Sequence, residues 1–180
     1  NFLINTILIS SATYLFLITL RDFFIKKFNN ISQNISHFGF SLLILSILFN
    51  SLFSSEIITN LKVGETFDDS ETKIFFKSIK QKDEKNFKSI IANFNIENPK
   101  GVIENLSPEL RIYNQPNIIT SEADIKTTMI SDKFIVINVV QNQDYFNVRY
   151  QVKPFMLWIW ISVLLISFGG MLSIFKKNYE

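Results

Sequence analysis

The stretch that decides the fold is NISHFGFSLLILSILFNSLFSSE, residues 34–56. From His37 to Ser55 it holds no Lys, Arg, Asp or Glu. About 20 consecutive apolar residues are enough for an α-helix to cross the hydrocarbon core of a bilayer. We therefore predict a membrane-spanning helix over residues 37–55. The same stretch carries the only histidine of the 180 residues, so its position needs an explanation.

Two further windows, Phe2–Leu20 and Pro154–Phe175, are also free of charged residues. The chain is 47% hydrophobic with nineteen Phe, and these apolar residues are bunched rather than spread as in a soluble domain. We predict transmembrane helices over 1–20, 37–55 and 154–175. The first is not a signal peptide, because its basic residues follow the apolar run instead of preceding it. The chain begins with Asn, so we expect a fragment or a processed piece.

Basic residues set the predicted orientation. Arg21, Lys26 and Lys27 fall in the loop 21–36, and Lys176 and Lys177 fall in the tail 176–180. The positive-inside rule places this loop and tail in the cytoplasm or its organellar equivalent. The segment 56–153 then lies outside, and its basic and acidic residues are nearly balanced, which argues against a nucleic-acid partner. The chain has no cysteine and hence no disulfide or thiol chemistry of its own.

The segment 56–153 changes from continuous to alternating apolar patterns. The runs TKIFFKSIKQ, FKSIIANFNIEN, KFIVINVV and YFNVRYQV are short, rich in Ile, Val, Phe and Tyr, and separated by polar clusters. Such runs predict strands, and QNQD at 141–144 predicts a hairpin between the last two. We expect about six to eight strands in a β-rich extracytoplasmic domain, either a small barrel or a sandwich.

His37 is the one candidate for chemistry. The paired carboxylates, Ser–His arrangements or Gly-rich phosphate loops of common active sites are missing or uninformatively placed. At the mouth of its predicted helix, an imidazole could simply reach interfacial water, and position alone favours that interpretation. Gly39 and Ser41 beside it would let a neighbouring helix or a flat ligand approach closely. A neutral imidazole in apolar surroundings is also the usual axial ligand of haem iron.

The third helix opens with VKPFMLWIW, in which Pro154 suits a first helical turn and Lys153 suits the outer interface. Trp158 and Trp160 are expected to form part of an aromatic belt. Gly169 and Gly170 further along would permit close packing against another helix.

Several segments together carry a resemblance. SHFGFSLLILSI, LKVGETF, SPELRIYNQPNIITSEADI, DKFIVI and VRYQVKPFMLWIWISVLLISFGGML occur in this order and span nearly the whole chain. They resemble the C-terminal part of CcmF, the large haem lyase subunit of the cytochrome c maturation system. The combination of KPF, WIW and GG with PELRIY is the most specific part of the match.

The resemblance implies a function. The family takes haem from a haem chaperone on the outer face and attaches it to apocytochrome c, working with thiol-handling subunits. His37 stands at the place of an axial ligand to a structural haem b within the membrane, whose other ligand is a histidine outside this sequence. It also implies an integral protein of a bacterial or mitochondrial inner membrane, surrounded by lipid, with the β-domain on the periplasmic side.

The departures from the family pattern limit this hypothesis. Full-length members carry more helices, a tryptophan-rich outer loop and two outer histidines, whereas this sequence has one histidine and two tryptophans. We therefore expect a truncated product or one piece of a split lyase, which would be catalytically incomplete without the N-terminal part. A second hypothesis stays open: a non-catalytic, membrane-anchored β-domain that acts as a protein-interaction or assembly module, with His37 merely at the interface.

Overall fold

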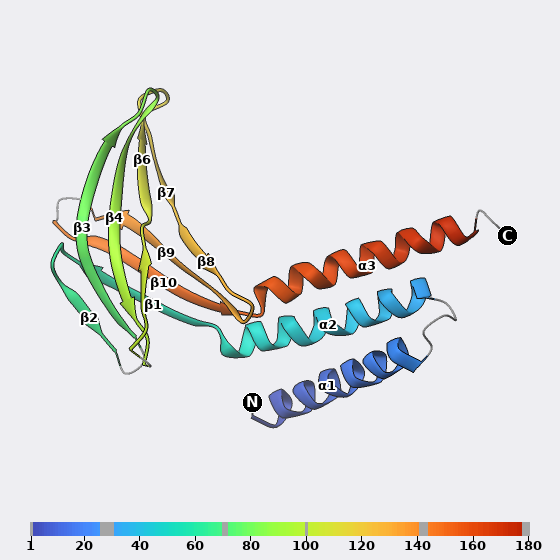
Figure 1. Cartoon of the computed structure of the whole chain (residues 1–180). Coiled ribbons are helices and arrows are strands. Elements are labelled where there is room, and N and C mark those ends of the chain that lie inside the picture. Colours follow the sequence, from blue (N-terminus) through green and yellow to red (C-terminus); the bar gives the residue numbers. More distant parts are fainter. Residues whose placement is uncertain (1, 26–30, 70–71, 100, 141–143, 178–180) are drawn as a thin grey trace. The chain divides into compact units, whose positions relative to one another are not determined.

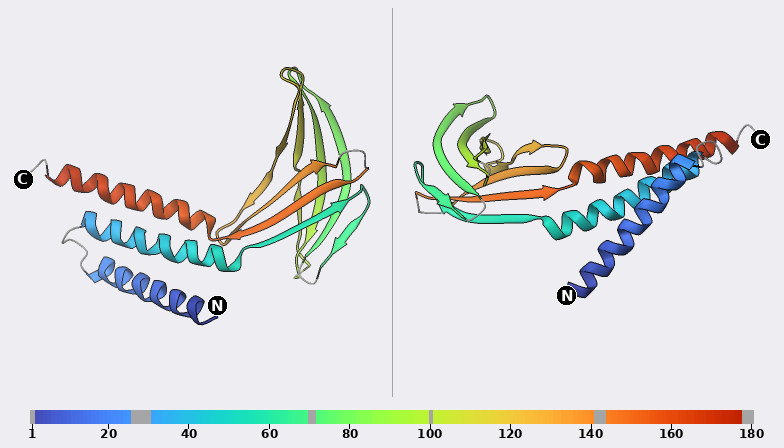
Figure 2. Two further views of the ribbon diagram at one scale, coloured as in Figure 1. Left: turned by 180° about the vertical axis from the view of Figure 1, so that it is seen from behind. Right: turned by 60° about the horizontal axis from the view of Figure 1, so that its bottom comes forward.

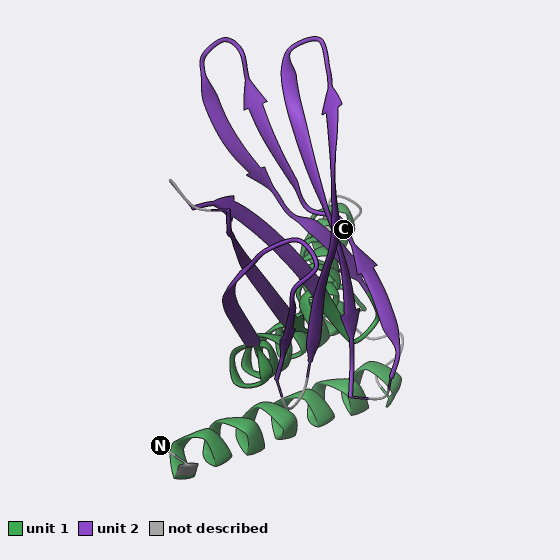
Figure 3. Cartoon of the chain, turned by 90° about the vertical axis from the view of Figure 1, so that its left-hand side faces the viewer, with its two compact units in different colours: residues 1–54, 128–132, 153–180 green, residues 55–127, 133–152 purple. Residues whose placement is uncertain are grey.

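The computed structural model describes residues 2–25, 31–69, 72–99, 101–140 and 144–177, and the chain divides into two compact units (Figures 1 and 3). The helical unit comprises residues 1–54, 128–132 and 153–180. The sandwich unit comprises residues 55–127 and 133–152. Each unit is described by itself.

Three long helices make up most of the helical unit: α1 (Phe2–Ile25), α2 (Ile31–Phe53) and α3 (Met156–Lys177). Each contains a span long and apolar enough to cross a membrane. Both α1 and α2 differ from the predicted spans, since α1 continues five residues past position 20 and α2 begins six residues before His37. The charge-free windows of the sequence cover only the most apolar part of each helix. The Ser, Asn and Gln residues before His37 do not end α2, because they do not break a helix as Pro would.

Helix α2 packs between α1 and α3 (Figure 1). The end of α2 lies beside the start of α3, because the side-chain amide of Asn50 donates to the Pro154 carbonyl at 2.7 Å. The Phe49 and Phe155 rings are also in contact there, with centroids 5.2 Å apart. The two helices are therefore antiparallel neighbours, and the chain leaves one and enters the other at the same end.

The sandwich unit consists of two antiparallel sheets. One sheet has the order β1-β10-β9-β8; the other has the order β2-β3-β4-β6-β7, with β5 also pairing with β4 (Figures 1 and 2). The strands are β1 (Ser55–Leu61), β2 (Thr66–Asp68), β3 (Lys73–Asp83), β4 (Phe87–Glu97), β5 (Ile103–Leu106), β6 (Glu109–Tyr113), β7 (Ile118–Glu122), β8 (Asp124–Thr127), β9 (Ser131–Val139) and β10 (Phe146–Pro154).

The core of the sandwich comes from alternate residues of its longest strands. Phe76 on β3 and Phe94 on β4 stack with centroids 4.4 Å apart, and Ile135 and Val148 from the other sheet are fully buried. Period-2 alternation puts such residues on one face of a strand, so two apolar faces meet in one interior. The remaining members of the core cluster are Leu61, Ile74, Ala92, Ile96, Leu106, Leu110, Ile137 and Tyr150.

The strand predictions are largely confirmed. The four alternating runs form β3, β4, β9 and β10, and β9 is the hydrogen-bonded neighbour of β10, as the predicted hairpin requires. Residues 141–143 of that hairpin lie outside the described residues. The expected number of strands was too low, because the described residues contain ten. Strands β2, β5 and β8 have three or four residues each, too few to show a clear alternation.

Candidate functional site on helix α2

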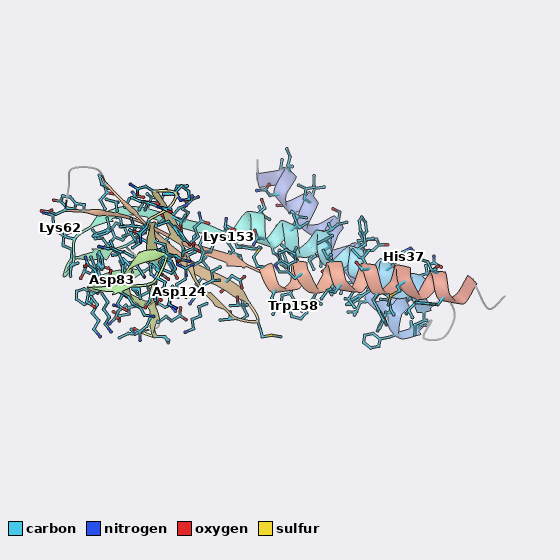
Figure 4. The ribbon with its side chains drawn as sticks, turned by 90° about the horizontal axis from the view of Figure 1, so that it is seen from above. His37, Lys62, Asp83, Asp124, Lys153 and Trp158 are labelled. Carbon is cyan, nitrogen blue, oxygen red and sulfur yellow. The ribbon has the colours of Figure 1, made fainter. Side chains whose placement is uncertain are left out.

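His37 lies inside α2 rather than at its entrance (Figure 4). The helix begins at Ile31, so His37 is about 9 Å along the axis at the usual rise per residue. Its side chain is exposed in this chain. The predicted position at the helix mouth was wrong, because the polar residues before it continue the helix.

The side of α2 that faces α3 is lined by small residues. A Cβ added at Gly39 would lie 3.0 Å from the Leu165 Cβ on α3, so a larger residue would require α3 to shift. Further toward the start of α2, the Ser36 hydroxyl donates to the Ile166 carbonyl at 3.5 Å. Gly169 of α3 fits against Ser32 and Ser36 in the same way. The expected close packing at Gly39 and Gly169 is confirmed, with helices of this chain as the partners.

A second side of α2 faces α1. The Phe38 ring contacts the rings of Phe16 and Phe23 on α1, with centroids 5.7 and 5.5 Å away. The Ser41 hydroxyl shares a hydrogen bond with Thr19 at 2.5 Å and also donates to the Phe38 carbonyl. Ser41 therefore joins α2 to α1 and is not an open surface for a ligand.

His37 belongs to neither of these contacts. Two residues at about 100° each place His37 nearly opposite Gly39 around the helix, and the exposed Gln33 and Phe40 lie toward the same side as His37. The imidazole is thus presented on a face that α1 and α3 leave uncovered. A polar side chain on the hydrocarbon-facing side of a spanning helix is costly unless it has a partner.

The described residues contain no cluster of three or more His, Cys, Asp or Glu that could hold a metal ion. A haem brings four equatorial ligands with its porphyrin, so a single imidazole such as that of His37 could hold a haem iron without a cluster of protein ligands. The exposed imidazole of His37, beside Gln33 and Phe40 on the uncovered face, fits that requirement.

The aromatic residues of α3 are placed differently from one another. The indole Nε1 of Trp158 donates to the Met129 carbonyl at 2.8 Å, whereas Trp160 is 62% exposed. The aromatic belt stays a prediction for both. Sequence analysis missed the turn that contains Met129, and the only local signal was the pair Met129 and Ile130 between polar neighbours.

The PELRIY segment forms a charged cluster on the sandwich. Both carboxylate oxygens of Glu109 accept from Arg111 at 3.1 Å, and Glu122 on the neighbouring strand lies 3.8 Å from the same guanidinium. The Arg111 guanidinium also lies over the Phe87 ring. Arg111 lowers the pKa of Glu109, and Glu109 raises the pKa of Arg111. These contacts of Arg111 link β4, β6 and β7, so the cluster has a structural role in its sheet.

These features define a membrane protein in which three apolar helices flank a β-sandwich. The family described as "CcmF C-terminal beta-sandwich" matches residues 52–154, which is more than half of the chain. The chain belongs to the CcmF family.

Curated relatives agree with this assignment. A cytochrome c-type biogenesis protein CcmF from Pseudomonas fluorescens is 29% identical over 82% of this chain and 22% of its own length. The cytochrome c-type biogenesis protein ccl1 of Rhodobacter capsulatus is 34% identical over 69% of this chain and 19% of its length. The Escherichia coli CcmF is 26% identical over 81% of this chain and 22% of its length. The chain spans about a fifth of the length of these relatives.

A solved structure supports the fold. The structure named "Cytochrome c Heme Lyase CcmF" superimposes with a TM-score of 0.63 and 18% identity, over 78% of this chain and 24% of that chain. At this identity the likeness concerns the arrangement of helices and strands.

Proposed function

We propose that this chain is the C-terminal portion of a haem lyase that attaches haem covalently to apocytochrome c, and that it supplies one axial ligand to an intramembrane haem b. Membership of the CcmF family supports the general role. The observation that carries the specific role is the exposed His37 on a helix face that neither α1 nor α3 covers.

His37 would hold the haem iron from one side, with a histidine outside this sequence on the other. A low-spin iron with two imidazoles has no open position, which suits one-electron transfer rather than release of haem. The residues of this chain would hold the imidazole in place: Gly39 and Ser36 fix α2 against α3, and Phe38 and Ser41 fix it against α1. The face with His37 would then be covered by helices of the N-terminal part of the lyase.

The remaining parts of the proposal follow from this role. The three helices would lie in a bacterial or mitochondrial inner membrane with the sandwich on the periplasmic side, as the basic residues predict. Partners would be the N-terminal part of the lyase, a haem chaperone, and apocytochrome c with its thiol-handling subunits. Thioether formation would need those partners, because the thiols that react with haem would come from apocytochrome c and this sequence has no cysteine.

The test compares reduced-minus-oxidised absorbance spectra of the complex purified through a tag on this chain. We expect low-spin haem b bands in the wild type and their loss in His37→Ala. Gln33→Ala is the matched control, because Gln33 is an exposed polar residue one turn earlier on α2. It should keep the bands.

A ligand role can be separated from a structural one by a rescue. In His37→Gly, added imidazole should restore part of the haem b signal if His37 binds iron, since a free imidazole can occupy the vacated position. A normal haem spectrum in His37→Ala would exclude the ligand role.

The second candidate is a protein-interaction module without a cofactor. It is favoured by β7, an edge strand of its sheet that carries exposed Ile118 and Ile119, since such an edge can pair with another strand. No haem in the wild-type complex, with the N-terminal part demonstrably present, would support this candidate instead.

A further inference from the structure

The turn between β8 and β9 exposes two large apolar side chains. Met129 is 63% exposed and Ile130 is 69% exposed. The turn is held closed by Thr128, whose amide and hydroxyl both donate to the Ser131 carbonyl, at 3.0 and 2.8 Å. The two apolar residues are therefore displayed at the tip of a well-defined turn.

This turn is fixed to the first turn of α3. The Phe155 amide donates to the Ile130 carbonyl at 2.8 Å, and the Trp158 indole donates to the Met129 carbonyl at 2.8 Å. Phe155 has a φ of 61°, a left-handed conformation that is uncommon for a side chain of this size. The backbone is held in this conformation where its amide meets the turn, so both tip residues are held at the level where α3 begins.

The start of α3 is also the start of a membrane span. Met156 begins the span Met156–Phe175, and Trp158 lies only about 3 Å further along the axis at the usual helical rise. Tryptophan with its N–H occupied is typical of the boundary between headgroups and acyl chains. A turn that is hydrogen-bonded to this residue must lie at the same depth.

We propose that the β8–β9 turn inserts Met129 and Ile130 into the bilayer interface, on the side where α2 ends and α3 begins. The occupant of this surface is lipid, because the two side chains are uncharged, exposed and fixed at the depth of a helix end. Residues 128–132 belong to the helical unit, so the turn adds an apolar contact with lipid beside the end of α2 and the start of α3. This inference rests on the membrane assignment and is independent of haem binding by His37.

The absence of native cysteine allows single labelling sites. The full chain would carry Ile130→Cys with an environment-sensitive fluorophore, reconstituted in phosphatidylcholine and phosphatidylglycerol nanodiscs. Lys85→Cys is the matched control, because Lys85 is an exposed residue in the turn between β3 and β4. We expect spin-labelled lipid to quench the probe at 130 several-fold more than aqueous iodide does, and the reverse at 85.

A second measurement uses the cysteine without a fluorophore, because an apolar dye could itself draw residue 130 into the bilayer. In nanodiscs, a charged maleimide should react with Ile130→Cys at least about tenfold more slowly than with Lys85→Cys, since water and ions are depleted in the interface. Quenching of the probe at 130 by iodide as at 85 would overturn the proposal. So would protection from both quenchers, because protein rather than lipid would then cover the turn.

Discussion

Tyr150 on β10 is buried in the core of the sandwich, and this burial changes the pKa of its phenol. Burial raises the pKa of Tyr150 to about 12, and the negative charge of Glu104 acts in the same direction. The phenol loses its proton near pH 10 in the unfolded chain and at a higher pH in the folded one. The stability that depends on the neutral phenol is therefore fully present below about pH 10 and is lost as the pH rises toward 12. Over this interval the equilibrium constant for unfolding increases by roughly tenfold per pH unit.

Tyr150→Phe should remove this part of the pH dependence. We expect the alkaline unfolding profile, followed by ellipticity of the strands, to become flatter between about pH 10 and 12. Tyrosinate absorbance should lose its component of highest apparent pKa. An unchanged profile in the variant would show that Tyr150 does not couple alkaline unfolding to proton release.

The adjacent glycines of α3 give a second prediction, because their surroundings differ. A Cβ at Gly169 would lie 2.7 Å from the Ser32 carbonyl oxygen and 2.8 Å from the Ser36 amide nitrogen, and backbone cannot move aside easily. Among the residues that the structure describes, none has an atom within 4 Å of a Cβ at Gly170. We expect Gly169→Ala to destabilise the α2–α3 pair by about 1–3 kcal/mol, as overpacking does.

Gly170→Ala is the control in the same motif. It should be neutral or slightly stabilising, because Ala favours a helix over Gly by about 1 kcal/mol. The measurement is the unfolding midpoint of the helical signal of each variant in detergent. Equal midpoints for the two alanine variants would contradict the close contact at Gly169.

At the scale of the elements, one largely buried ion pair connects the two sheets. Glu104 on β5 binds Lys133 on β9 at 2.8 Å, and these side chains are only 9% and 14% exposed. Lys126 lies 3.7 Å from the other oxygen of Glu104 but is 46% exposed. Removing one member of a buried pair leaves an uncompensated charge, whereas an exposed pair contributes little.

Lys133→Ala should therefore destabilise the sandwich by about 3–5 kcal/mol, and Lys126→Ala by less than about 1 kcal/mol. The double variant Glu104→Leu with Lys133→Met should recover much of the loss, since it buries no lone charge. Urea unfolding followed by strand ellipticity measures all three. Similar losses for the two single lysine variants would rule out a special role for the Glu104–Lys133 contact.

The sequence predicted those elements that a local pattern defines. Uninterrupted apolar runs mark three helices, and alternation with Phe76 and Phe94 facing inward marks β3 and β4. Short strands such as β8 carry too few residues for a period to appear. The uncovered face around His37 was not predictable either, because it depends on which sides of α2 the other helices occupy. The same holds for the contact from Trp158 to Met129, which joins residues 29 positions apart.

At the scale of the whole molecule, the sandwich has a complete interior of its own. Every member of the main core cluster belongs to the sandwich unit, residues 55–127 and 133–152. Its two chain ends are also held together, since Ser55 pairs with Val152 in the register of β1 and β10. A domain with its own core and paired ends should fold and unfold as a unit.

We therefore expect two unfolding transitions in the full chain in detergent, one for the strands and one for the helices. A fragment of residues 55–152 should keep the first transition within a few degrees of its position in the full chain, because no core residue is lost. Gly169→Ala should move only the helical transition, and Lys133→Ala only that of the strands. A single transition that both variants shift together would mean that the sandwich depends on the helices for its stability, and the fragment would then be unfolded on its own.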